Sequence, residues 1–196
     1  MVDGLEDAGN QDSPLTHSTP PLELPIDHLW SGGPALPEET ALVRVTPGSD
    51  YWELAVEAPF HGDPPPPGPS GATPGLWNFE VVEWFIAGPE ERYLEVELGP
   101  HGHHLVLRLE GVRQVIEEAL PLSYAVERRL GRWSGVAQIP VDWLPPKPWR
   151  VNAYAIHGTE GGRRYLAAHP APGSAPDFHR LDSFAPVPSL ADPPAD

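Results

Sequence analysis

The chain has 196 residues, with 12 Lys and Arg against 28 Asp and Glu, 28 Pro, 7 Trp and no Cys. A formal net charge of −16 would repel a phosphate backbone, which excludes nucleic acid as an expected partner. The absence of Cys excludes disulfides and thiol nucleophiles, and no apolar run approaches the roughly 18 residues that a membrane helix needs, so no membrane partner is expected.

Polar, Pro-rich segments flank one expected domain. Residues 1–25 hold few large apolar side chains and cannot recover the entropy lost on ordering, so we expect a disordered acidic and Pro-rich leader. Residues 187–196 repeat that composition, and we expect a disordered tail there. The domain is therefore expected to span residues 26–186. The first ten residues carry acids in place of a basic start and an apolar stretch, which predicts a soluble, cytoplasmic protein.

Most of the domain alternates apolar and polar residues with a period of two, the pattern of strands. Short strands at this spacing predict an all-β fold, an antiparallel β-sandwich with little helix. The predicted strands are 41–46, 51–58, 80–87, 93–98, 104–109, 122–127, 133–139, 151–157 and 164–168.

Alternation also assigns side chains to faces of the sheets. In 51–58, Trp52 shares one face with apolar neighbours, and both Trp52 and Trp133 are expected in the core. In 93–98, Glu95 and Glu97 alternate with apolar residues, which predicts that they lie on a solvated face.

The connections are short or rich in Pro and Gly. Residues 62–75 contain six prolines and predict an extended excursion between strands, and residues 99–102 predict a hairpin connection. A helix of one or two turns is expected at 114–120, and a short turn at 141–144 is expected to end before Pro145.

Trp77 stands out among the seven indoles. It follows the Pro-rich excursion and precedes Asn78, Glu80 and Glu83, so it is either a packing residue or an aromatic at the edge of a ligand site. An indole can stack on the CH-rich face of a sugar ring while carboxylates and amides bind the hydroxyls.

Catalytic and metal signatures are weak. Glu80, Glu83, Glu95 and Glu97 are compatible with an acid/base pair, a Ca²⁺ site or a solvated sheet face, of which alternation favours the last. The His101, His103 and His104 cluster lacks metal-ligand spacing, and the nucleophile and phosphate-loop motifs are absent. The sequence therefore predicts no catalytic residues, no metal and no cofactor.

Four segments carry a family resemblance: LWNFEVVEWFI (76–86), RYLEVELGPHGHHLVLRL (92–109), RVNAYAIHG (150–158) and PDFHRLDSF (176–184). In order and spacing they resemble the uncharacterised chromosome 4 open reading frame 33 protein family, over about residues 26–190. That family is similar to carbohydrate-binding module family 9, whose β-sandwich holds sugar ends between two aromatic rings. The resemblance implies the same fold and a carbohydrate or other small ligand.

The resemblance also implies site residues. Trp77 matches the first clamp indole and Glu83 the carboxylate that binds sugar hydroxyls, whereas Phe178 takes the place of the second clamp indole. Glu95 and Glu97 stand where the relatives carry basic and amide side chains. The expected ligand-binding residues are Trp77, Glu80, Glu83, Asn152, Tyr154, Phe178 and His179.

These observations favour a non-catalytic ligand-binding β-sandwich, with carbohydrate as the first ligand to test. Two alternatives stay open. One is a hydrolase that uses the clustered Glu and His residues, and the other is a protein-interaction domain in which residues 64–69 dock as polyproline in a partner's aromatic groove. The oligomeric state is not indicated.

Overall fold

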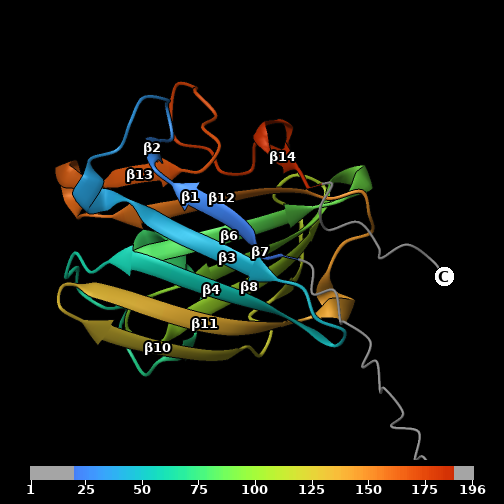
Figure 1. The fold of residues 1–196 in the computed structure, drawn as a ribbon, viewed down its shortest axis with the longest axis horizontal. Coiled ribbons are helices and arrows are strands. Elements are labelled where there is room, and N and C mark those ends of the chain that lie inside the picture. Colours follow the sequence, from blue (N-terminus) through green and yellow to red (C-terminus); the bar gives the residue numbers. More distant parts are fainter. Residues whose placement is uncertain (1–19, 188–196) are drawn as a thin grey trace, which may run out of the picture.

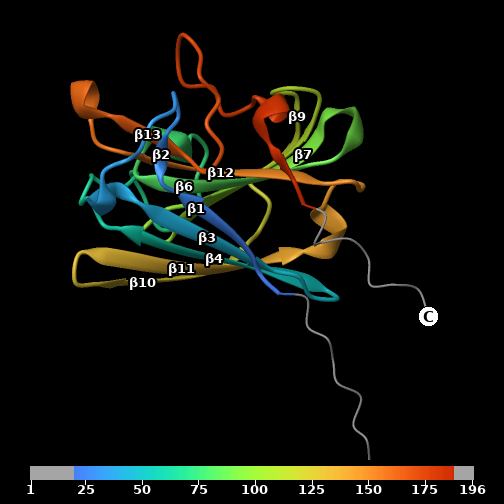
Figure 2. The same cartoon turned by 45° about the horizontal axis from the view of Figure 1, so that its top comes forward.

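The computed structural model describes residues 20–187, which form two stacked sheets (Figures 1 and 2). The five-stranded sheet has the order β1 (Leu22–Ile26), β3 (Ala41–Thr46), β4 (Tyr51–Pro59), β11 (Arg132–Pro140) and β10 (Ser123–Arg129). All of its neighbouring strands are antiparallel.

The second sheet has nine strands and carries the outer face discussed below. Its main path is β2 (His28–Leu29), β13 (Arg164–Ala167), β12 (Arg150–His157), β6 (Val81–Ala87), β7 (Arg92–Leu98), β8 (His103–Glu110) and β5 (Gly71–Ala72). Two further strands extend it, since β9 (Val115–Glu118) pairs with β8 and β14 (Ala185–Pro186) pairs with β12. The pairing of β5 with β8 is parallel and the other pairings are antiparallel.

The helices among the described residues are single 3₁₀ turns of three residues each. They are η1 (Pro37–Glu39), η2 (Leu76–Asn78), η3 (Pro89–Glu91), η4 (Val141–Trp143), η5 (Glu160–Gly162) and η6 (Leu181–Ser183). None of these turns has the length or apolar character to cross a membrane. The all-β antiparallel sandwich predicted from the period-two pattern is confirmed.

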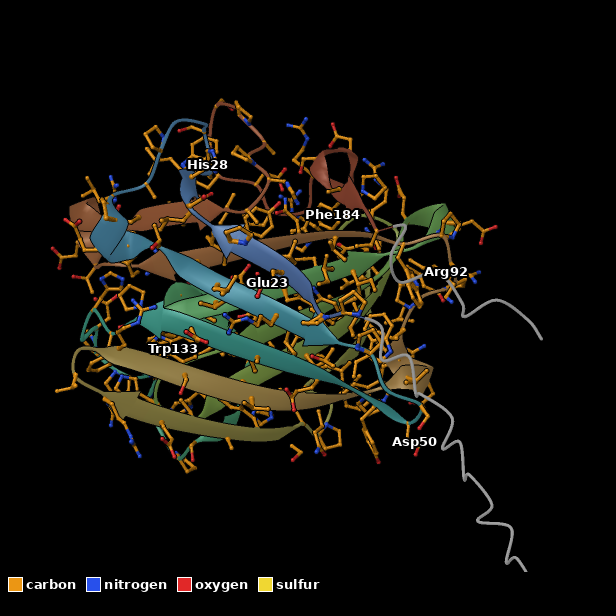
Figure 3. All side chains as sticks on the ribbon, viewed as in Figure 1. Glu23, His28, Asp50, Arg92, Trp133 and Phe184 are labelled. Atoms are coloured by element: carbon orange, nitrogen blue, oxygen red, sulfur yellow. The ribbon has the colours of Figure 1, made fainter. Side chains whose placement is uncertain are left out.

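Two clusters of buried side chains lie on the two faces of the nine-stranded sheet. The larger cluster fills the space between the sheets and includes Trp52, Trp84 and Trp133. The smaller cluster lies on the outer face, around Phe85, Tyr154 and Phe184. Figure 3 marks one aromatic residue of each cluster, Trp133 and Phe184. The prediction that Trp52 and Trp133 are core residues is confirmed.

A glycine on β11 leaves room for a tyrosine from the neighbouring strand β10 that connects the two sheets. A Cβ atom at Gly135 would lie 2.8 Å from the Tyr124 ring, so the ring packs directly over this backbone. The Tyr124 hydroxyl, on the five-stranded sheet, donates to the carbonyl of Gly99 in the β7–β8 connection at 2.9 Å. The hairpin connection predicted at 99–102 is confirmed, because β7 ends at Leu98 and β8 begins at His103.

Two predictions about local structure are wrong. The segment 114–120 contains β9 rather than a helix, because Val115–Glu118 pairs with the edge of β8. The expected leader at 1–25 contains β1 in its last residues, since Leu24 is buried against the core and pairs with Val43. The remainder of that leader, residues 1–19, and most of the expected tail, residues 188–196, lie outside the described residues.

Candidate functional site

Three glutamates occupy neighbouring positions on the outer face of the nine-stranded sheet. In the register between β6 and β7, Glu83 lies opposite Glu97 and Phe85 lies opposite Glu95. Because side chains alternate along a strand, the three glutamates project from the same face. Glu83, Glu95 and Glu97 are only 2%, 3% and 0% exposed, so the predicted solvated face for Glu95 and Glu97 is wrong. Loops cover this face.

Burial raises the pKa of all three carboxyl groups. The pKa of Glu95 is raised to about 8. Burial also raises the pKa of Glu83 and Glu97 well above the usual value, and the negative charge of neighbouring carboxyls adds to the effect. Within the described residues, Oε1 of Glu83 and Oε2 of Glu95 have no hydrogen-bond partner. Both oxygens are buried, so each lacks a hydrogen-bond donor that a ligand at the floor of the cavity would supply, and protonated carboxyls can donate as well as accept.

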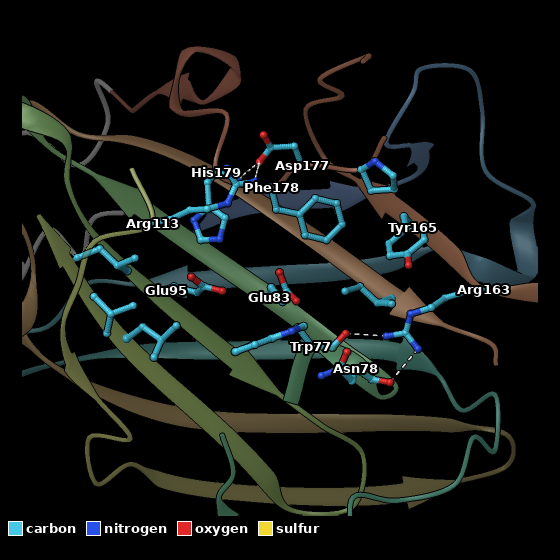
Figure 4. A pocket seen from close by; sticks show the side chains of 15 residues that line it. Trp77, Asn78, Glu83, Glu95, Arg113, Arg163, Tyr165, Asp177, Phe178 and His179 are labelled. Atoms are coloured by element: carbon cyan, nitrogen blue, oxygen red, sulfur yellow. Dashed lines mark hydrogen bonds and ion pairs between the residues drawn. The ribbon is translucent and has the colours of Figure 1, made fainter. Parts of the chain in front are cut away.

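A cavity of about 440 Å³ opens over these glutamates (Figure 4). Its volume falls within the range of small-molecule sites. Strands supply part of the lining, and turns and loops from four parts of the chain supply the rest. The lining residues are Trp77, Asn78, Glu83, Glu95, Leu107, Leu109, Arg113, Val115, Ile156, Arg163, Tyr165, Pro176, Asp177, Phe178 and His179.

Trp77 belongs to the turn η2, which begins after a glycine. Gly75 has a φ of 76°, in the left-handed region that favours glycine, and its carbonyl accepts from Asn78 Nδ2 at 3.1 Å. The turn buries Leu76 in the outer cluster and leaves the indole of Trp77 44% exposed beside the cavity. The turn thus presents a large aromatic side chain to a ligand and anchors it through its neighbour.

Arg163, in the loop before β13, fixes the same turn by direct hydrogen bonds. Its guanidinium donates to the carbonyls of Trp77 at 2.6 Å and Asn78 at 2.9 Å, and to that of Phe79 at 3.3 Å. It also donates to the carbonyl of Gly158 at 3.3 Å. These bonds join two loops that are far apart in the sequence.

Phe178 lies against a buried tyrosine. Its ring is stacked on that of Tyr154, with centroids 3.9 Å apart and an angle of 4° between the planes. Tyr165 meets Phe178 edge-on at 6.2 Å. Because Tyr154 is on β12 and buried, the phenyl ring from the loop is held by the sheet.

The loop that carries Phe178 is tied to the connection between β8 and β9. Asp177 Oδ1 accepts from Arg113 Nη2 at 2.7 Å and from the backbone N–H of His179 at 3.0 Å. The Tyr93 hydroxyl accepts from the backbone N–H of Arg113 at 2.8 Å and forms a second hydrogen bond with His179 Nδ1, also at 2.8 Å. Burial lowers the pKa of His179 to about 4, so the ring is neutral at physiological pH.

The structure brings Trp77, Glu83, Phe178 and His179 to one cavity and places the other expected ligand-binding residues outside its lining. Tyr154 lies beneath Phe178. The side chain of Asn152 is fully buried and bonds to the Tyr154 hydroxyl and to both backbone groups of His169. Asn152 and Tyr154 therefore support the site and do not line it.

Glu80 also departs from its expected place. It accepts from the backbone N–H groups of His61 at 3.0 Å and Asp63 at 3.2 Å, and so attaches the start of the Pro-rich excursion to β6. It lies beside a separate, small cavity with Glu39 and His157. The physical reason is alternation: Glu83 faces outward on β6, so Glu80, three residues earlier, faces the opposite way.

Several lining residues were missed by sequence reasoning. Arg113, Arg163 and Tyr165 lie in or after loops with no motif around them. Asp177 was also missed, although a signal was available, because it directly precedes Phe178 in a segment that carried the family resemblance. Within residues 20–187, no group of three or more His, Asp or Glu side chains is arranged to hold a metal ion.

Curated relatives match most of the chain. It is 41% identical over 172 residues to the UPF0462 protein C4orf33 of Homo sapiens, covering 83% of this chain and 86% of that protein. It is also 41% identical over 172 residues to the Danio rerio homolog, covering 83% and 87%. No family model matches the chain.

Solved structures are similar to this chain at low sequence identity. A "putative carbohydrate-binding protein" from Bacteroides uniformis superposes with a TM-score of 0.64 at 17% identity, over 85% of each chain. A carbohydrate binding module family 9 domain from Caldicellulosiruptor kristjanssonii in complex with glucose gives a TM-score of 0.48 at 12% identity, over 74% of this chain and 72% of that one.

Proposed function

Since the chain belongs to the UPF0462 protein C4orf33 family, as its sequence motifs predicted, we propose that this family member binds a carbohydrate in the Trp77 pocket without converting it. The shared fold does not define a ligand, because one fold hosts many functions. The proposal therefore depends on the pocket. The Bacteroides uniformis protein of similar fold is described as carbohydrate-binding, which makes sugars the first ligands to test.

The observation that carries the proposal is an exposed indole and a phenyl ring lining the same cavity as two buried carboxyl groups. Trp77 and Phe178 offer flat apolar surfaces for the CH face of a sugar ring. Glu83 and Glu95 offer oxygens without hydrogen-bond partners in the described residues. A sugar has both kinds of surface, and the combination is typical of ligand sites with an apolar lining and few polar groups.

A hydrolase is the second candidate, favoured by the carboxyl groups in the cavity. Glycoside hydrolysis needs two carboxyls whose pKa values are moved apart, one protonated and one ionised. Here burial raises the pKa of both Glu83 and Glu95, so the site does not move the two pKa values in opposite directions. The stacked pair His61 and His157 lies at the other, smaller cavity. This arrangement supports binding more than catalysis.

The protein-interaction alternative depends on the Pro-rich excursion. Pro66 is buried, whereas Pro64, Pro65, Pro67 and Pro69 are exposed. Exposed prolines alone do not favour a docking role over the pocket, because the pocket that a ligand-binding protein requires is present.

The test is a titration of mono- and disaccharides followed by Trp emission. We expect at least one sugar to change the emission at millimolar concentration or below, and Trp77→Ala to abolish that change. Tyr51→Ala is the matched control, because Tyr51 is an equally accessible aromatic on the five-stranded sheet, outside the pocket lining. The absence of any response across the panel would overturn the proposal, as would a response that persists without Trp77. A panel of chromogenic glycosides tests the hydrolase alternative, which predicts turnover that Glu83→Gln abolishes.

A further inference from the structure

The glutamates at the floor of the pocket have carboxyl oxygens that no side chain or backbone group of the described residues binds. Glu83 and Glu95 line the cavity, and Glu97 lies beside them as the register partner of Glu83. Oε1 of Glu83 and Oε2 of Glu95 have no hydrogen-bond partner in the described part of the chain. A buried polar group without a partner is unfavourable, so these oxygens would gain from donors brought by a ligand.

The two arginines in the lining already bind other groups of the protein. Arg113 is ion-paired with Asp177 at 2.7 Å. Arg163 is surrounded by backbone carbonyls of η2 and of Gly158, and its charge only partly offsets the effect of burial on Glu83. When one of the glutamates below the cavity ionises, neither arginine is therefore free to pair with it.

The neutral groups around the cavity add no cation. His179 is neutral at physiological pH, because burial lowers its pKa, and it bonds to the Tyr93 hydroxyl. Tyr154 is likewise buried, which raises its pKa. An ionised glutamate in this pocket would therefore find its positively charged partner in the ligand.

We propose that the pocket selects sugars that carry a protonated amino group, with the ammonium against Glu83 and Glu95 and the sugar ring against Trp77. This inference rests on the proposed carbohydrate-binding function and adds a ligand class to it. An ammonium supplies a charge and three N–H donors, whereas a hydroxyl at the same ring position supplies one donor and no charge. Hydrogen bonds to charged groups are stronger than neutral ones, a difference that corresponds to about tenfold in affinity.

The proton balance follows from the same geometry. A carboxyl that is protonated in the empty pocket ionises when the ammonium arrives, and its proton passes to the buffer. The product is an ion pair between the bound amine and a buried carboxylate. A neutral sugar needs no such ionisation and releases no proton.

The experiment is isothermal titration calorimetry of the full chain with matched sugar pairs at neutral pH. The pairs are D-glucosamine with D-glucose and D-galactosamine with D-galactose. N-acetyl-D-glucosamine is a further control, because acetylation converts the amine into an uncharged amide. We expect an amino sugar to bind about tenfold or more tightly than its hydroxyl counterpart. Its binding heat should vary with the ionisation heat of the buffer, which shows proton release, and that of the neutral sugar should not.

Two substitutions distinguish specific binding of the amino sugar in the pocket from non-specific attraction of a cation to an acidic protein. Glu83→Gln keeps the shape and should abolish the preference for the amino sugar. Glu53→Gln removes one charge from an exposed position on β4 and should retain the preference. A preference that survives Glu83→Gln would overturn the inference.

The outcomes distinguish the two proposals. Equal binding of both members of every pair overturns the inference and leaves the carbohydrate proposal in place. Failure of every sugar to bind, with or without an amine, overturns both. Binding of amino sugars with a preference that depends on Glu83 supports both.

Discussion

The ring of Tyr154 lies parallel to that of Phe178, 3.9 Å away, so a buried residue of the sheet supports an aromatic residue from a loop. The Tyr154 hydroxyl accepts from Asn152 Nδ2 at 2.8 Å, and that amide in turn holds the backbone of His169. The orientation of Phe178 in the pocket is therefore determined by residues that do not line the pocket.

The first prediction separates stacking from hydrogen bonding at Tyr154. Tyr154→Phe keeps the stacked ring and should leave sugar affinity unchanged, with a loss of stability of about 1 kcal/mol from the missing hydrogen bond. Tyr154→Leu removes the flat support and should weaken sugar binding. Calorimetric titration and thermal unfolding of both variants check this. Equal affinity of the leucine variant would show that the stacking does not position Phe178.

The second prediction concerns pH and Glu95. Its pKa in the folded protein is about 8, raised by burial from the ordinary 4.5, so the folded state binds the proton more tightly than the unfolded state. The stabilisation is fully present below pH 4.5 and is lost as the pH rises to about 8. Glu95→Gln, which stays neutral, should therefore be more stable than the unsubstituted protein at pH 8.

Thermal unfolding between pH 5 and pH 8 tests that prediction. The melting temperature of Glu95→Gln relative to the unsubstituted protein should increase with pH, by roughly 2–4 °C for each kcal/mol gained. Glu53→Gln is the matched control on an exposed position of β4 and should show no such trend. Parallel curves for Glu95→Gln and the unsubstituted protein would contradict a raised pKa at this position.

The third prediction concerns the arginine that holds the Trp77 turn. Arg163→Lys keeps a charge but not the planar fork that donates to several carbonyls, so it should lower stability by about 1–3 kcal/mol. It should also weaken sugar binding, because η2 carries Trp77. Arg44→Lys on the five-stranded sheet, where Arg44 pairs with exposed Glu23 and Glu57, should have little effect on stability, because solvent screens exposed ion pairs. Equal stability losses in the two variants would contradict a special role for Arg163.

The fourth prediction concerns the buried Glu39. Arg164 donates to both of its oxygens, at 2.7 and 2.8 Å, and these hydrogen bonds lower the pKa of Glu39. Arg164→Ala leaves Glu39 with the backbone N–H of Leu36 as a remaining donor and should lower the free energy of unfolding by about 1–3 kcal/mol, because the lost guanidinium is partly exposed. Arg180→Ala breaks an exposed pair with Asp182 and should have little effect. Chemical denaturation of both variants checks the difference, and similar midpoints would contradict it.

The sequence was sufficient to predict the strands and the sandwich, because alternation reports which residues share a face. It could not report what covers each face. Glu95 and Glu97 alternate with apolar residues as a solvated face would, yet the loops that carry Trp77 and Phe178 bury them. Those contacts join residues far apart in the chain, and no local pattern encodes them.

The same limit explains the misplaced site residues. Asn152 and Glu80 are polar residues near the expected motifs, and a sequence does not show whether a polar side chain bonds to a ligand or to the protein's own backbone. Both bond to the backbone here. The strand β9 was missed because 115–118 is an exposed edge strand without apolar alternation to mark a core face.

A crystal structure of the protein soaked with D-glucosamine tests the central claim most directly. The account predicts a sugar ring packed against the Trp77 indole, with a polar atom within hydrogen-bond distance of Glu83. A pocket that stays empty at saturating sugar, or a sugar bound only elsewhere on the surface, would contradict it.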